Sequence, residues 1–417
     1  MSREKKPLKI LYPEGQKYAC RDCPARCCTS SWGIPVTEEE CDRIMSDDSA
    51  RERLGWRGEE ILRAGVLPMR EKDEKLACVF LDDDLLCSLH KKHGHTFIPA
   101  PCQAFPFGFS TNEKKQPVAL LSRYCPSIRD NYGELVGEII AEKLQQAGGA
   151  HPMSESMGLR SGRVLPQSQY VSLVEQWRSI LVQGDNTSLS LAHIFDFTDA
   201  LDAALPKTKK PDDHELMDAL NQASEIEVAP LLPGKLKFGG RMLVAHLLGG
   251  ICYPSRVMLA HRMTRITLWE KARSWVNRLA WLFSLGTVKL LFVDLPVRVA
   301  RVQGVAPFLA SPKGKIVSEY LVELLDRRQG LSKQAYLHRV IVDLALMTAL
   351  ISRYARAAAA AENLKEVTEH HIREGIGIAE LLFSHQGDSG QSIVLQQLRM
   401  TLMSNREDFR RLLAAET

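Results

Sequence analysis

The sequence predicts a mainly α protein with two unlike parts, a small cysteine-rich α+β metal-binding module followed by a large all-helical region. Two observations predict this division. Nine of the ten cysteines lie at or before Cys125, and beyond about residue 170 the apolar residues recur with the spacing of α-helices. Between these parts, residues 147–169 are rich in Gly, Ser, Met and Pro. We therefore predict a module at 1–146, a linker at 147–169 and a helical domain at 170–417.

The bulk properties are those of an ordinary globular chain. The 417 residues are 45% hydrophobic and 25% charged, with a formal net charge of +4, so the balance indicates no nucleic-acid partner. The apolar stretches are short or interrupted by charge, which predicts no membrane span. The charged segment Met1–Pro7 predicts no secretory signal. We expect a cytoplasmic protein whose thiols stay reduced and form no disulfides.

The cysteine-rich part should alternate short helices and strands. Thr37 with Glu40 has the pattern of a capping box, which predicts a helix to about Met45. An apolar run at 77–81, three aspartates, and a second run at 85–89 predict a β-hairpin with a thiol in each arm. Residues 118–122 predict a strand, and residues 131–146 predict a helix.

The rest of the chain should be helical, with prolines between the helices. The predicted helices cover residues 171–181, 191–204, 214–223, 241–251, 256–283, 317–325, 333–361, 368–384 and 391–413. Residues 294–307 could include a strand. Arg256, Arg262 and Arg265 lie near Trp269 and Trp275. We expect these arginines to face water while the aromatic rings enter the core, although a groove for an acidic partner is an alternative.

Four cysteines within nine residues, Cys20, Cys23, Cys27 and Cys28, favour a metal site. The spacing of Cys20 and Cys23 lets two thiolates bind one ion, and Cys27 or Cys28 can add a third. We expect this adjacent pair to point apart. Four later cysteines could complete the site or form a second one: Cys78, Cys87, Cys102 and Cys125. Cys41 and Cys252 are better explained as small buried hydrophobic residues.

Two kinds of metal centre fit these residues, a zinc ion or an iron–sulfur cluster. Cys23-Pro24 and Cys125-Pro126 resemble the Cys-Pro pairs near cluster ligands in ferredoxins. Arg21 and Arg26 would offset thiolate charge or face water. Three nearby histidines could be zinc ligands, although a charged loop favours solvated side chains; they are His90, His93 and His95.

The ordered series of cysteine motifs resembles a known family. Cys20-x2-Cys23-x3-Cys27-Cys28 is followed by Cys78-Val-Phe-Leu, Cys87-Ser-Leu and Cys102-Gln-Ala-Phe-Pro. Over roughly residues 18–127 this is similar to the family named for its CxxCxxCC motif, which is described as a zinc- or iron-chelating domain. The resemblance implies that the cysteines of this series are metal ligands. One departure is that three residues, instead of two, separate Cys23 from Cys27, so either member of the adjacent pair could be the ligand.

The layout of a cysteine cluster followed by a helical region is also similar to the flagellin lysine-N-methylase family, as is the segment from Ser318 to Arg328. This resemblance implies methyl transfer from S-adenosylmethionine to lysines of a protein substrate. We find no glycine-rich loop after a strand, so such activity would use the cysteine centre. The alternative is a non-catalytic interaction or metal-handling protein stabilised by zinc.

Overall fold

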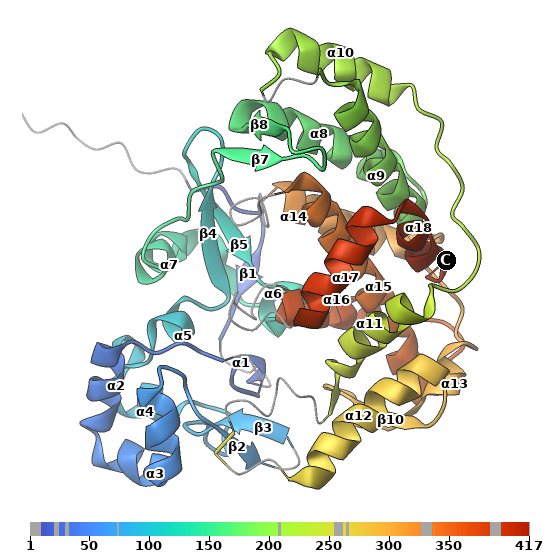
Figure 1. Cartoon of the computed structure of the whole chain (residues 1–417). Helices are drawn as coiled ribbons and strands as arrows, with labels where there is room; N and C mark the ends of the chain where they lie inside the picture. The colour runs from blue at the N-terminus through green and yellow to red at the C-terminus, as the bar shows by residue number, and fades with distance from the viewer. Residues whose placement is uncertain are drawn as a thin grey trace, which may run out of the picture.

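The protein is mainly α, and the prediction of its fold class is confirmed. The computed structural model describes residues 10–20, 25–29, 33–72, 75–206, 210–253, 262–263, 267–326, 336–383 and 393–416. In Figure 1 the cysteine-bearing elements, blue to cyan, lie to one side of the long C-terminal helices, which are orange and red. The green helices cover one end of the molecule.

The cysteine-bearing part consists of short elements. Its helices are α1 (Arg26–Thr29), α2 (Glu38–Met45), α3 (Asp48–Arg63), α4 (Ser88–His93), α5 (Ala100–Ala104), α6 (Pro126–Asp130) and α7 (Ile140–Gln146). Its strands form three antiparallel pairs, β1 (Lys17–Tyr18) with β6 (Glu134–Leu135), β2 (Met69–Lys72) with β3 (Lys75–Cys78), and β4 (Phe107–Thr111) with β5 (Pro117–Leu121).

The capping box is confirmed. Thr37 accepts a hydrogen bond from the amide of Glu40, and the Glu40 carboxylate accepts one from the amide of Thr37. The strand predicted at 118–122 is also present, as β5.

The predicted β-hairpin at 77–89 is wrong in its pairing. β3 pairs with β2, which precedes it in the chain. Of the expected hairpin, the bridge between Leu81 and Cys87 is present, and the amide of Asp82 donates to the carbonyl of Leu86. The second arm then turns into α4, for which Cys87 is the N-cap residue. Apolar runs do not specify their partner strand, because any exposed backbone edge can supply the hydrogen bonds.

The helix predicted at 131–146 forms only in its second half, as α7. Asn131 ends α6 in the left-handed region, with φ of 53° and ψ of 51°. Gly133 has φ of 111°, and a Cβ there would lie 2.4 Å from the backbone of Tyr18. β1 therefore approaches too closely for another residue at 133, and its pairing with β6 replaces the helix.

Residues 147–169 contain regular structure. β7 (Ser156–Gly158) pairs with β8 (Val164–Pro166), and Met157, Leu159 and Leu165 are fully buried in the main core. The division of the chain into a module, a linker and a helical domain stays a prediction.

The helical body agrees with most of the predicted segments. Its helices are α8 (Gln167–Gln183), α9 (Thr187–Ala204), α10 (Asp213–Ser224), α11 (Phe238–Gly249), α12 (Leu268–Phe283), α13 (Val299–Val302), α14 (Lys315–Asp326), α15 (Leu337–Ala361), α16 (Glu369–Phe383), α17 (Ile393–Ser404) and α18 (Arg406–Ala414). The helix predicted at 391–413 is two helices, α17 and α18. The chain breaks at Asn405, whose side chain accepts a hydrogen bond from the amide of Asp408 and so caps α18.

The prediction that this body is all-helical is wrong. A three-stranded antiparallel sheet has the order β11 (Val297–Arg298), β10 (Thr287–Leu290), β9 (Cys252–Tyr253). β11 lies within the segment that could include a strand. Part of the predicted helix at 256–283 lies outside the described residues, but Arg262 bridges to Met69 in a strand-like pairing.

The core is centred on α15, a 25-residue helix that contacts α9, α13, α16, α17 and α18. One hydrophobic cluster extends from Ile34 in the cysteine-bearing part to Leu413 in α18. A smaller cluster joins β4, β5, α6 and α7 around Phe109 and Ile128.

The expectation that the arginines before helix α12 face water while Trp269 and Trp275 enter the core is wrong for the residues that the structure describes. Arg262 is buried and pairs with Glu71 and Glu270, and Arg256 and Arg265 lie outside the described residues. Trp269 and Trp275 are 73% and 58% exposed. The buried residues of α12 include Trp281 and Asn277, whose side chain donates to the carbonyl of Tyr253. Arg278 is also buried, and its guanidinium lies 4.7 Å from the Trp275 ring centre.

None of the described helices is both long and apolar enough to cross a lipid bilayer.

Candidate metal centre

Four separate elements bring cysteines together beside the main core. α1 carries the adjacent pair Cys27 and Cys28, and it contacts β3, which ends at Cys78. Cys87 precedes α4, and Cys102 lies inside α5. Cys78 is buried in the main core, and the side chains of Cys28, Cys87 and Cys102 pack against that core. Charge interactions link Cys28 with Cys78 and Cys102, and Cys87 with Cys27, so these thiols lie in one region.

The adjacent pair does not point apart. The Sγ atoms of Cys27 and Cys28 are 3.8 Å apart, so our expectation for this pair is wrong. A hydrogen bond between the two thiols lowers the pKa of Cys27 and raises that of Cys28 well above its usual range, and burial raises the pKa of Cys28 further. Of the two thiols, Cys27 is therefore the one that loses its proton more readily.

Three further thiols are within electrostatic reach of this pair. Burial and the charge of Cys87 raise the pKa of Cys78 to about 12. Burial, followed by the charges of Cys78, Cys27 and Cys87, raises the pKa of Cys102 well above its usual range. The pKa of Cys87 is raised by burial, with a contribution from Cys27. These five thiols, which we call the thiol cluster, each disfavour the negative charge of their neighbours.

Two buried side chains fix the α5 segment that carries Cys102. At its start, Glu40 accepts a 2.7 Å hydrogen bond from the amide of Ala100. At its end, the ammonium of Lys143 donates a 2.9 Å hydrogen bond to the carbonyl of Gln103. Both Glu40 and Lys143 are buried, so α5 is held at each end by a charge of the sign that its backbone dipoles favour.

Cys20 and Cys125 lie beside Tyr18, at the edge of the thiol cluster. Burial is the main cause that raises the pKa of Tyr18, and the charges of Cys20, Cys125 and Cys27 add to it. The pKa of Cys20 is raised by burial and by Cys27, while a hydrogen bond with Tyr18 and the charge of Lys143 oppose that rise. Cys125 is buried in the smaller core cluster. Within the thiol cluster, Cys27 is the member whose charge acts on both Tyr18 and Cys20.

The positions of the predicted ligands are thus clear for seven of the eight cysteines. Cys23 lies outside the described residues. Within the described part of the chain, the structure records no disulfide and no group of three or more His, Cys, Asp or Glu side chains in the arrangement of ligands to one ion.

Cys41 and Cys252 lie apart from the other thiols. Cys41 is buried, and its charged neighbours are Arg63, Asp42 and Glu38. Cys252 is fully buried and accepts a 3.2 Å hydrogen bond from the Trp281 indole. Both side chains belong to the hydrophobic core, as the sequence predicts.

Of the three neighbouring histidines, His93 is bound to a carboxylate. Its Nε2 contacts the buried carboxylate of Asp47, and its ring stacks on Phe97 with centroids 4.0 Å apart. The rings of His90 and His95 meet edge to face, 5.4 Å apart. Burial and the charge of Lys143 lower the pKa of His95, which favours its neutral form.

The sequence offers two places for Arg26, beside the thiolates or in water. The structure instead pairs it with a carboxylate of the helical body. Its guanidinium makes 2.6 Å and 2.8 Å contacts with the carboxylate of Glu374 in α16. It also lies 4.2 Å from the ring centre of Phe292. Arg129 of α6 shares the same carboxylate. The residue before the cysteine pair is therefore held by the helical body. Arg21 lies outside the described residues.

A second buried carboxylate, Glu380, joins α16 to the segment before Cys125. It accepts hydrogen bonds from the Ser122 hydroxyl at 2.8 Å, the Tyr124 amide at 3.1 Å and the Tyr320 hydroxyl at 3.1 Å. Gly377 permits this approach, because a Cβ there would lie 3.2 Å from the carbonyl oxygen of Arg123.

These positioning residues were not found by sequence analysis. A usable signal was present, since Glu374 and Glu380 flank the apolar run Gly-Ile-Gly-Ile-Ala. Carboxylates on the core face of a helix require partners. Which arginines and amides supply them depends on tertiary contacts that no local pattern specifies.

Comparison with known proteins gives little further information. No family model matches the chain, and no solved structure matches it. It is 24% identical to an uncharacterized protein of Methanocaldococcus jannaschii over 132 residues, which are 32% of this chain and 44% of that protein. The match thus spans less than half of that relative.

Proposed function

We propose that the protein is a cysteine-cluster metal protein, with Cys27, Cys28, Cys78, Cys87 and Cys102 supplying ligands for zinc or an iron–sulfur cluster. The observation that carries the proposal is the meeting of five thiols from four elements. Cys20 and Cys125, next to Tyr18, would belong to the same centre or to a second one. Cys23 is included on its sequence spacing alone.

The electrostatics of the thiol cluster support a cation there. Each ionised thiol raises the pKa of its neighbours, and burial adds to the effect. A divalent ion or an iron–sulfur core reverses this, because it stabilises several thiolates at once. Without an ion, burial and the neighbouring thiols favour the protonated forms of Cys28, Cys78, Cys87 and Cys102. Metal binding would then release protons and stabilise the fold of this region.

The ligand chemistry is compatible with both metals. Thiolate-only sites hold zinc in a closed tetrahedron or bind iron–sulfur clusters, and histidine is not required for either. Because His93 is committed to Asp47, we assign no histidine to the centre. In the cytoplasm, where we place the protein, the thiols would stay reduced and available.

Anaerobic purification followed by metal and acid-labile sulfide quantification tests the proposal. Iron with sulfide and a broad visible absorbance would assign a cluster, while stoichiometric zinc in a colourless protein would assign the structural site. Cys78→Ser and Cys102→Ser should each lose metal, whereas Cys252→Ser, a matched buried thiol outside the cluster, should retain it. Protein without metal, or with equal metal in all three variants, would contradict the proposal.

A catalytic extension is methyl transfer to protein lysines from S-adenosylmethionine. Its support is the similarity of the 318–328 segment to flagellin lysine-N-methylases. The described part of that segment is α14, where Ser318 bonds with the Thr187 hydroxyl at 2.8 Å and Tyr320 with Glu380. These contacts give α14 a packing role. Incubation of the metal-loaded protein with labelled S-adenosylmethionine and a lysine-rich protein tests the extension, and absence of label transfer would refute it.

A further inference from the structure

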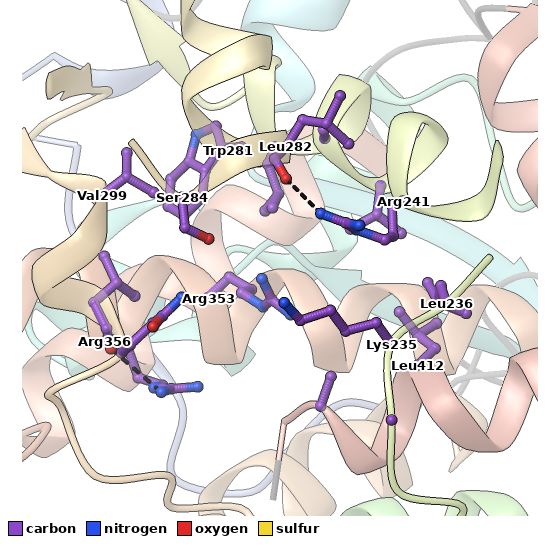
Figure 2. A pocket seen from close by; sticks show the side chains of 17 residues that line it. Lys235, Leu236, Arg241, Trp281, Leu282, Ser284, Val299, Arg353, Arg356 and Leu412 are labelled. Carbon is purple, nitrogen blue, oxygen red and sulfur yellow. Dashed lines mark hydrogen bonds between the residues drawn. The ribbon is translucent and has the colours of Figure 1, made fainter. Parts of the chain in front are cut away.

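The helical body contains a cavity far along the chain from the cysteines. Its volume is about 270 Å³, near the lower end of the range for small-molecule sites, roughly 300–1,000 Å³. Helices α11, α12, α13, α15 and α18 surround it, together with the segment that precedes α11. Figure 2 shows the lining side chains.

The charge of the lining is of one sign. Four basic side chains line the cavity, Lys235, Arg241, Arg353 and Arg356, and none of the described lining residues is acidic. Glu416, which is not a lining residue, makes a 2.6 Å ion pair with Arg353. That pair balances one of the four positive charges, and the charge of Glu416 also acts on Arg356. Arg241 and Lys235 have no carboxylate among the described residues of the lining.

The partners of two arginines in the lining are neutral oxygens. Arg356 is 9% exposed, and it donates to the carbonyls of Val305 and Val302, both at 3.2 Å. Arg241 donates to the carbonyl of Leu282 at 2.9 Å, a bond drawn in Figure 2. A carbonyl positions a guanidinium but does not neutralise it, so these charges can still attract an anion.

The remaining wall is apolar. Trp281, Leu248, Val299 and Leu412 line the cavity beside the basic groups, and all four are buried. An apolar part of a ligand would gain free energy by displacing water from these surfaces. The cavity thus offers positive charge and an apolar wall within one small volume.

We propose that this cavity binds a small organic anion, one that combines a single carboxylate or phosphate head with an apolar body. The head would pair with basic side chains of the lining, and the body would pack against Trp281. A cation would be repelled by the lining, and a neutral apolar molecule would leave Arg241 and Lys235 without a counter-ion in the lining. This site is independent of the proposed metal centre.

Calorimetric titration of the purified protein with simple probes tests the ligand class. Phenyl phosphate and phenylacetate represent the two heads, inorganic phosphate lacks the apolar body, and benzyl alcohol lacks the charge. We expect at least one of the first two to bind about tenfold or more tightly than either of the last two. If neither anion binds at about 10 mM, or if benzyl alcohol binds equally well, the proposal is wrong.

Variants test the location. Lys235→Gln changes an exposed side chain and should weaken binding of the better anion by about tenfold without affecting the fold. Arg356→Gln should weaken it at least as much, and Arg356→Lys, which retains the charge, should bind more tightly than Arg356→Gln. The control is Arg301→Gln in α13, an exposed arginine outside the cavity that bonds with Asn363 at 2.7 Å. Unchanged affinity in both glutamine variants at Lys235 and Arg356 would overturn the proposal.

Discussion

The cysteine-bearing region and the helical body are stabilised in different ways. In the body, α15 extends over 25 residues and buries nearly all of them against five other helices. In the cysteine-bearing region, α1, α4 and α5 have four to six residues each and meet at thiols and buried charges. Elements this short gain little from their own hydrogen bonds. Besides the apolar residues that the region contributes to the main core, we expect the ion pairs to α16 and the proposed metal to join these short elements.

The largest expected effect concerns the junction of the two regions. Glu374→Gln would leave Arg26 and Arg129 buried without their shared counter-charge, and we expect a loss of about 3–5 kcal/mol in the free energy of unfolding. Urea unfolding measures it. The control is Glu369→Gln on the same helix, whose 3.6 Å pair with Arg373 is exposed and should matter by less than about 0.5 kcal/mol. Equal effects would show that the junction does not depend on charge.

The helical body should instead be sensitive to lost volume. Leu346→Ala removes a fully buried side chain from α15, with an expected cost of about 2–5 kcal/mol. Leu285→Ala, at a position that is 65% exposed, should cost less than about 0.5 kcal/mol. Thermal or urea unfolding of both variants compares them. A small effect at Leu346 would mean that the body is held by something other than the packing of α15.

A pH-dependent contribution is expected at Asp47, in the cysteine-bearing region. Its carboxylate caps α3 and pairs with Lys92 at 2.8 Å. Lys92, Ser49 and His93 hold its pKa well below the usual range. Because the folded pKa lies below the unfolded value of about 3.9, the charge stabilises the fold above about pH 4, and this stabilisation is lost as the pH falls further.

Asp47→Asn tests this, since asparagine retains the helix cap. At pH 7 we expect a loss of about 1–2 kcal/mol, which should shrink as the pH falls below about 4. Unfolding curves at pH 7 and pH 3 measure the difference. Asp48→Asn, at a neighbouring exposed carboxylate, should show little change at either pH. A difference that stays constant with pH would exclude the charge as the cause.

The smallest effect is expected on the outward face of α12. Trp269→Gln removes a large apolar side chain that is 73% exposed, so stability should change by less than about 0.5 kcal/mol. Trp281→Ala on the same helix removes a buried ring and should cost about 3–5 kcal/mol. A large loss in Trp269→Gln, measured by thermal unfolding, would mean that this face is covered in solution.

The predictions from sequence succeeded where local chemistry was decisive. The capping box at Thr37 and the helix α14 follow from residues close together in the chain, and both are present. The pairing of β3 with β2, and the split of the 131–146 segment at Gly133, depend on distant backbone. For α12 the local pattern was misleading, because periodicity gives the helix but not which of its faces meets the core.

By itself the sequence determined that the protein is mainly helical and where most helices lie, since helical periodicity and caps are properties of neighbouring residues. It also singled out the cysteines. Only the tertiary structure decided that Cys27 and Cys28 turn toward one another, that Cys78, Cys87 and Cys102 join them, and that Glu374 and Glu380 fix the surrounding segments. These relations depend on the packing of elements up to hundreds of residues apart, and such packing is set by the fit of whole surfaces instead of by any local pattern.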